Sequence, residues 1–122
     1  MNDLEEIYYK VSKPNGWDFY TGPTINYRKN IGGTVRVKDY DTPAVLYSSS
    51  VIHASREPLQ ALAYGKIPCS LYRVAGKPVV KDTDTYGFKE LKVLEEVTDL
   101  DAAFGFKYNE SVNPVNPCDI IP

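Results

Sequence analysis

His53 is the only histidine of the chain and the residue best suited to acid–base chemistry near neutral pH. Ser48, Ser49 and Ser50 shortly precede it, and a histidine beside serines can activate a hydroxyl if a third group orients the ring. The Gly-x-Ser-x-Gly turn that presents a nucleophilic serine is absent. We therefore expect a structural role for His53, with a place in the lining of a site as the alternative.

Three pairs of carboxylates are considered as candidates for chemistry. They are Asp39 and Asp41, Asp82 and Asp84, and Glu95 and Glu96. A calcium loop needs more oxygen ligands at regular spacing and a glycine turn. One histidine and two distant cysteines are too few for an ordinary zinc site, so we expect no metal. On a strand, one of the two adjacent glutamates would face inward, where it could serve catalysis, although a surface pair is the commoner explanation.

The ten tyrosines and the net charge of −2 bear on the kind of partner. A nucleic-acid binder usually shows a basic excess or stripe, whereas Lys and Arg are scattered here, which makes nucleic acid an unfavourable partner. Tyrosine favours strands and half-buried surfaces, and with arginine it is enriched at protein interfaces. We predict a protein-binding surface with four candidate anchors. These are Tyr20, Tyr27, Tyr40 and Arg56.

Three features favour a cytoplasmic location. The first residues are acidic and lack the apolar run of a signal peptide. No apolar stretch approaches the length that spans a membrane. Two cysteines, Cys69 and Cys118, are fewer than a secreted disulfide scaffold usually has, so we expect free thiols in a reducing compartment.

Several stretches rich in β-branched and aromatic residues predict the strands that must position these side chains. They cover residues 7–11, 17–20 with 25–27, 34–37, 44–47, 69–74, 79–80 and 88–97. The stretch 44–47 is predicted to be extended and buried, and 88–97 is predicted as one long strand. The connections are short, which favours antiparallel pairing.

Helix signals are concentrated at two places. Ser55 is predicted as the N-cap of a short helix at about residues 56–64, which Gly65 would end in a left-handed conformation. Leu59, Leu62 and Ala63 would share the buried face of this helix. Thr98 is predicted to cap a second short helix that ends at Gly105.

Together these elements predict an α+β fold with a mostly antiparallel, twisted sheet of five to seven strands. Residues 1–106 are expected to form a single domain. Residues 107–122 contain Asn113-Pro114 and Asn116-Pro117 and are expected to be an extended, Pro/Asn-rich C-terminal tail.

Several segments in order resemble a family of small phage and mobile-element proteins of unknown function. The segments are Tyr8-Tyr-Lys-Val11, Asp18-Phe-Tyr-x-Gly22, Leu46-Tyr-Ser-x-Ser-Val-Ile-His-Ala-Ser55, Pro68-Cys-x-Leu-Tyr-Arg-Val74, Gly76-x-Pro-Val79 and Tyr86-Gly-Phe-x-x-Leu-x-Val-x-Glu-Glu96. The resemblance implies no mechanism. It implies a phage context, in which small acidic proteins are often accessory factors that bind host proteins.

The order of three residue types is also similar to that of ADP-ribosyltransferases. That fold places a basic residue or His on an early strand, a Ser-Thr-Ser-like strand next and a Glu near the end. Lys10, Ser49 and Glu95 or Glu96 follow this order, and His53 would join them. The basic residue is Lys and the middle residue is Ser, and a lysine lacks the bidentate fork that arginine offers a phosphate or carboxylate.

The leading hypothesis is a non-enzymatic protein-binding accessory protein of the phage or mobile-element type, without a cofactor. One alternative is an NAD-using, ADP-ribosyltransferase-like enzyme with a site built from the residues just named. A second alternative is an oligomeric structural component of a virion. The residues favour the non-enzymatic hypothesis, because no complete catalytic signature is present.

Overall fold

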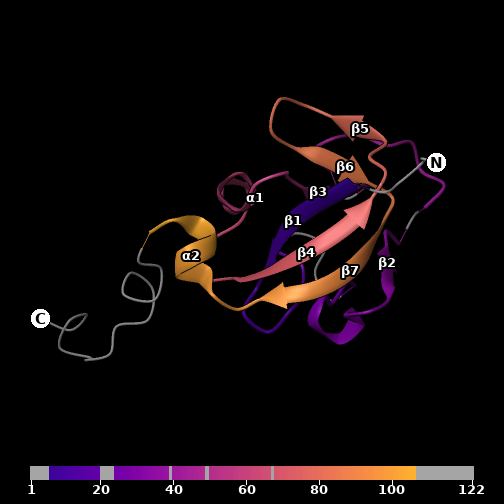
Figure 1. Ribbon diagram of the computed structural model, residues 1–122. Coiled ribbons are helices and arrows are strands. Elements are labelled where there is room, and N and C mark those ends of the chain that lie inside the picture. Colours follow the sequence, from indigo (N-terminus) through magenta and orange to yellow (C-terminus); the bar gives the residue numbers. More distant parts are fainter. Residues whose placement is uncertain (1–5, 20–23, 39, 49, 67, 107–122) are drawn as a thin grey trace, which may run out of the picture.

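The computed structural model describes residues 6–19, 24–38, 40–48, 50–66 and 68–106. Within these ranges the chain forms two antiparallel sheets and two short α-helices, so the predicted α+β fold is confirmed (Figure 1). The tail predicted for residues 107–122 lies outside the described residues. None of the described helices is long and apolar enough to cross a membrane.

The larger sheet has the strand order β1-β4-β7-β2. Its strands are β1 (Glu6–Ser12), β4 (Ser70–Gly76), β7 (Glu90–Val97) and β2 (Thr34–Arg36). The smaller sheet has the order β3-β6-β5. Its strands are β3 (Ile52–Ala54), β6 (Tyr86–Phe88) and β5 (Val80–Lys81). The helices are α1 (Pro58–Tyr64) and α2 (Leu100–Phe104), and a 3₁₀ turn spans Arg28–Asn30.

One short backbone bridge joins the two sheets. Tyr9 of β1 and Ser55, the residue after β3, exchange two backbone hydrogen bonds of 2.6 and 3.0 Å. Aromatic and aliphatic side chains such as Tyr8, Tyr72 and Phe88 form the core on one face of the larger sheet. The helices α1 and α2 cover the opposite face beside Leu71. The bridge therefore fixes how β1, β3 and the start of α1 lie together.

The predicted first helix exists and ends at Tyr64 as predicted, but its predicted N-cap and the predicted conformation of Gly65 are wrong. It begins at Pro58, and Ser55 caps nothing because its backbone is paired with Tyr9 and it is only 1% exposed. Gly65 follows the helix in an extended conformation, with φ −106° and ψ −153°, and is not left-handed. Ala61 is the buried residue of the helix, while Leu59 is 52% exposed and does not belong to a buried face.

Three other predicted elements differ from the structure. The single strand predicted at 88–97 is two strands in different sheets, with Lys89 between them. The Lys89 ammonium donates to the carbonyls of Thr42 and Ser50 at this break. Of the predicted strand 17–20, Trp17 forms only an isolated bridge, and Tyr20 lies outside the described residues. The segment 44–47 is not buried, since Tyr47 is 55% exposed.

The second helix follows the prediction closely. Asp99, one residue after the predicted cap, accepts a hydrogen bond from the backbone N–H of Ala102. Gly105 has the left-handed φ of 78° and ends the helix as predicted.

Candidate functional site

A buried ion pair lies at the centre of the candidate site. The side chains of Lys10 on β1 and Asp18 are about 5% and 4% exposed, and Lys10 Nζ lies 3.4 Å from Asp18 Oδ1. Tyr27 donates its hydroxyl to the same oxygen at 2.5 Å. Burial lowers the pKa of Lys10, and the Asp18 carboxylate opposes that shift. Asp18 thus provides the charge and the acceptor that a buried ammonium needs.

His53 forms a second cluster of rings with Tyr47 and Tyr64. The backbone N–H of Tyr47 donates to His53 Nε2 at 2.6 Å, and the Tyr64 hydroxyl lies 3.3 Å from the same nitrogen. The ring centroids of His53 and Tyr64 are 4.3 Å apart. Burial, with a smaller contribution from the Lys10 charge, lowers the pKa of His53 to about 4. The imidazole is therefore neutral at pH 7 and acts as an acceptor at Nε2.

Tyr47 has an unusual backbone conformation. Its φ of 64° is positive, and Tyr47 is the only described non-glycine residue with this feature. Such a conformation costs on the order of 1–3 kcal/mol and persists where surrounding contacts hold it. The hydrogen bond to His53 supplies one such contact at the amide, and the Tyr47 hydroxyl donates to Asp82 Oδ2 at 3.0 Å. The tyrosine is thus held at both ends.

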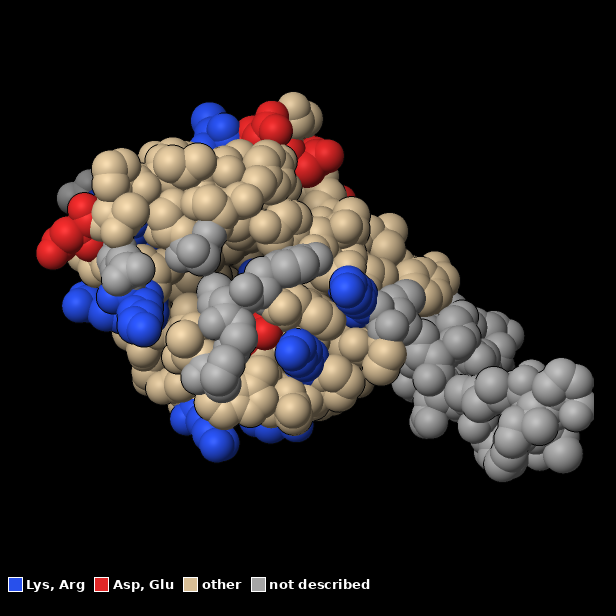
Figure 2. Space-filling model, turned by 180° about the vertical axis from the view of Figure 1, so that it is seen from behind, with Lys and Arg blue, Asp and Glu red and all other residues tan. Residues whose placement is uncertain are grey.

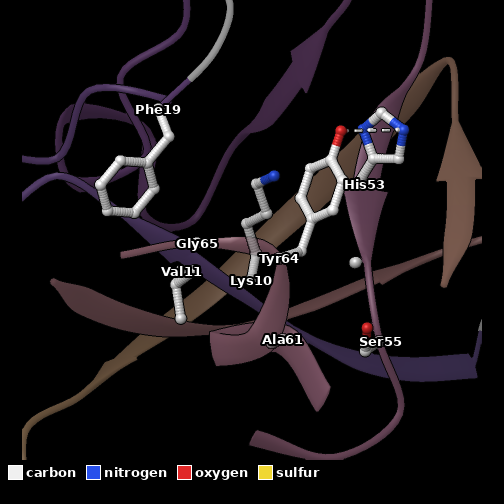
Figure 3. A pocket seen from close by; sticks show the side chains of 9 residues that line it. Lys10, Val11, Phe19, His53, Ser55, Ala61, Tyr64 and Gly65 are labelled. Atoms are coloured by element: carbon white, nitrogen blue, oxygen red, sulfur yellow. Dashed lines mark hydrogen bonds between the residues drawn. The ribbon is translucent and has the colours of Figure 1, made fainter. Parts of the chain in front are cut away.

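Lys10, Tyr64 and His53 line a small cavity beneath the end of α1 (Figure 3). The cavity has a volume of about 10 Å³, room for roughly one water molecule. Gly65 also lines it, and a side chain there would collide with β1, because a Cβ atom would lie 2.3 Å from Val11 Cγ2. In this conformation the cavity has no room for a ligand as large as NAD.

Tyr64 also borders a larger, open groove between α1 and the turn at residues 82–85, which we call the α1 groove. The groove has a volume of about 320 Å³. Its described lining consists of Leu59, Gln60, Ala63, Tyr64, Asp84 and Thr85. Gln60 donates to Asp84 Oδ1 at 3.2 Å, so a hydrogen bond ties the helix to the turn. The buried cluster and the α1 groove thus share Tyr64 as a common wall.

The structure brings together two of the five residues of the predicted enzyme site. Lys10 and His53 line the same cavity. Glu96 lies in the same cross-strand row as Lys10, with Tyr72 between them, but both of its oxygens bind Arg28 at 3.1 Å. Ser49 lies outside the described residues.

Glu95 is the fifth residue of that predicted site, and its carboxylate binds Arg73 at 2.6 Å on the solvent-exposed surface. Neither Glu95 nor Glu96 is among the residues that line the cavity. Within the described ranges, no three His, Cys, Asp or Glu side chains are grouped to hold a metal ion.

The predicted binding anchors have different surroundings. Tyr27 is wrong as a surface anchor, because it is fully buried and bound to Asp18. Tyr20 lies outside the described residues. Tyr40 is 41% exposed, with the guanidinium of Arg36 above its ring at 4.6 Å. Arg56 is exposed, and it lies over the rings of Tyr8 and Tyr86 while it binds Glu6.

Sequence reasoning missed Asp18, Tyr47 and Tyr64 as members of the site. The position of Asp18 could have been predicted from the turn that precedes it. A backbone hydrogen bond from Lys13 to Trp17 closes the turn at 13–17, and the chain after it returns toward β1. Tyr47 and Tyr64 had none, since only the tertiary fold brings the loop of Tyr47 and the end of α1 to His53.

The basic side chains are dispersed. Figure 2 shows the Lys and Arg residues of one face in separate groups, divided by uncharged surface. The described residues visible on this face do not form the continuous basic stripe that is typical of nucleic-acid binding.

Comparisons with protein-family models, with curated proteins and with solved structures gave no match.

Proposed function

We propose that this chain is a non-enzymatic protein-binding module and that the α1 groove is its binding surface. The observation that carries the proposal is an open groove of about 320 Å³ with a strongly exposed leucine, Leu59, in its lining. Tyr47, which is 55% exposed, contacts the Tyr64 wall with ring centroids 5.9 Å apart. Tyrosines beside apolar residues are typical of the anchors at protein interfaces.

The groove is held in shape before any partner arrives. Gln60 binds Asp84 across it, and Tyr47 is fixed by Asp82 at its hydroxyl and by His53 at its amide. Pre-organised side chains lose less conformational freedom when they bind, so more of the contact energy appears as affinity. The buried cluster beneath the groove supports binding in this way, without needing to contact the partner.

The dimensions of the two hollows favour a protein partner over NAD. Lys10 and His53 face a cavity with room for roughly one water molecule. The α1 groove is open, whereas sites for small molecules usually bury most of the ligand surface. A protein segment lying along an open groove fits this shape. The accessory role implied by the phage resemblance makes a bacterial host protein the expected partner.

A capture experiment with matched variants tests the proposal. Tagged wild-type protein, Leu59→Asp and Leu94→Asp are compared in a bacterial lysate. Leu94 of β7 is 38% exposed and is not part of the described groove lining, so it provides the control. Both positions are exposed, and circular dichroism should show that both variants fold, because exposed substitutions usually change stability by about 0.5 kcal/mol or less.

We expect a partner that binds wild type and Leu94→Asp but is lost with Leu59→Asp. With the purified partner, Leu59→Asp should weaken binding roughly 30-fold or more, the effect of losing a hot-spot contact. A partner that binds both variants equally would show that the α1 groove is not the binding surface. Failure of the wild type to bind any protein selectively would contradict the proposed function itself.

A further inference from the structure

The turn beside the α1 groove carries two carboxylates that no described cation neutralises. Asp82 and Asp84 are both exposed, and the backbone N–H of Asp82 donates to the carbonyl of Thr85 to close the turn. The salt bridges of the described residues involve five other acidic side chains. These are Asp18, Glu96, Glu90, Glu6 and Glu95. The described lining of the groove likewise contains no Lys or Arg.

The hydrogen bonds of these two aspartates come from neutral donors. Asp82 accepts from the Tyr47 hydroxyl and from the backbone N–H of Thr83, and Asp84 accepts from Gln60. A carboxylate has about four acceptor positions. Each group therefore keeps both its negative charge and the capacity to accept further hydrogen bonds. The existing bonds fix the directions in which those oxygens point.

An exposed aromatic ring lies beside one of these carboxylates. The Tyr47 hydroxyl is 3.0 Å from Asp82, and the residue is 55% exposed. A guanidinium can stack on an aromatic face and at the same time pair with a carboxylate through its planar fork. Asp84 and Leu59 line the groove, and Asp82 and the Tyr47 ring lie next to it, since Tyr47 contacts both Asp82 and the Tyr64 wall. This combination of a ring, two carboxylates and an apolar leucine is complementary to an arginine with an apolar neighbour.

We propose that the α1 groove binds an arginine side chain of its protein partner. The guanidinium lies against the Tyr47 ring and pairs with the carboxylates of Asp82 and Asp84, while an apolar side chain next to the arginine packs on Leu59. This inference rests on the proposed function and specifies the chemistry of the partner. Charge-assisted pairs of this kind supply both specificity and orientation.

Nuclear magnetic resonance of the full chain tests the inference with a defined probe. The tripeptide N-acetyl-Leu-Arg-Leu-amide is added up to about 5 mM, a concentration at which even weak sites are occupied measurably. The amide resonances of Tyr47, Tyr64 and Asp84 should shift. The counterpart with citrulline keeps the shape of arginine but has no charge, and it should bind at least roughly fivefold more weakly. The counterpart with lysine should also bind more weakly, because it lacks the planar fork.

Variants identify the charges responsible. In Asp82→Asn/Asp84→Asn the side-chain oxygens can still accept the hydrogen bonds from Tyr47 and Gln60, but the charges are lost. Binding of the arginine peptide should fall at least roughly fivefold, and the salt dependence seen with the wild type should shrink. Glu95→Gln removes a carboxylate that is paired with Arg73 and lies outside the described groove lining, so it should bind like wild type.

Several results would overturn the inference. They are equal binding of the arginine and citrulline peptides, equal binding of the arginine and lysine peptides, unchanged binding by the double variant, and the absence of shifts at the groove. If the capture experiment still shows a partner that depends on Leu59, the proposed function stands and only the arginine is wrong. If the peptide binds as expected but no protein partner depends on Leu59, the proposed function fails, and the groove is a cation site without that partner.

Discussion

The buried His53 ring should make the stability of the protein fall steeply between pH 7 and pH 5. The residue is 6% exposed, and burial with the nearby Lys10 charge lowers its pKa from 6.5 to about 4. The unfolded chain therefore binds a proton on this side chain at a higher pH than the folded chain does. Because stability rises with pH wherever the unfolded state binds more protons, the contribution is complete above pH 6.5 and is lost as the pH falls toward 4.

The magnitude follows from the two pKa values. At pH 5, roughly 97% of unfolded chains but only about 10% of folded chains carry a protonated His53. This difference lowers the free energy of unfolding by about 2 kcal/mol between pH 7 and pH 5. With the urea dependence of a small domain, the denaturation midpoint should fall by about 1 M. Since the chain has one histidine, no other histidine contributes in this range.

Urea denaturation at pH 7, 6 and 5 measures the effect, and His53→Gln is the control. A glutamine oxygen can accept the hydrogen bond from the Tyr47 amide, but the side chain does not titrate. The variant should therefore lose most of the pH dependence above pH 5. The pKa of His53 in the folded protein can also be read from the titration of its ring resonances. A midpoint between 6 and 7, or an unchanged pH dependence in His53→Gln, would refute this account of the buried cluster.

Three further predictions concern the same region. Lys10→Met should destabilise the fold by about 3–5 kcal/mol, because it removes the ammonium that pairs with the buried Asp18 carboxylate. Adding Asp18→Asn should restore part of this stability in urea denaturation, and a double variant no more stable than the single one would contradict that cause. Gly65→Ala should lower the free energy of unfolding by about 1–3 kcal/mol, because the new Cβ atom would collide with Val11. Gly33→Ala, whose new Cβ atom would have its nearest contact at 3.4 Å, should lower it less in the same assay. Equal losses of stability in the two variants would argue against the steric cause. NAD at about 1 mM should leave the melting temperature unchanged, and a clear increase that Lys10→Met abolishes would favour the transferase hypothesis instead.

Local patterns in the sequence were sufficient for β1 and β4 of the larger sheet. The run Ile7-Tyr-Tyr-Lys-Val11 predicted β1, and the apolar run that begins at Cys69 predicted β4, because β-branched and aromatic residues suit a pleated, buried surface. The existence of α1 was also predictable. Its start was not, since Ser55 has the side chain of a helix cap but its backbone pairs with Tyr9, a contact across 46 residues of sequence.

The break between β6 and β7 had only a weak local signal. Lys89 and Glu90 place two polar residues between Phe88 and Leu91, but the apolar pattern resumes after them and predicts one uninterrupted strand. The break accompanies the binding of the Lys89 ammonium to the carbonyls of Thr42 and Ser50, about 40 or more residues away in sequence. Phe88 then pairs with β3, while Glu90 pairs with β2. Long-range hydrogen bonds of this kind cannot be read from propensity.

The candidate site shows the same division between residue type and position. The chemistry of Lys10 and His53 marked both as candidates, but tyrosine is equally suited to a core and to a surface. Tyr27 was therefore predicted at the surface and lies in the core, and Tyr47, which was predicted to be buried, is exposed. Asp18 accepts the hydroxyl of the buried Tyr27, whereas His53 accepts the backbone N–H of the exposed Tyr47, and both partners are set by the tertiary fold.

The polar interior itself supports a binding role for the surface above it. A buried ion pair is weak evidence for stability, because well-packed apolar residues of similar size are often at least as favourable. The Lys10–Asp18 pair and the His53 acceptor instead act on geometry. Lys10 lies 5.8 Å from the centre of the Tyr64 ring, and His53 holds both Tyr64 and the strained backbone of Tyr47. Two tyrosines of the proposed binding surface are thus positioned from beneath by charged or polar groups with directional requirements, which an apolar core of equal stability would not impose.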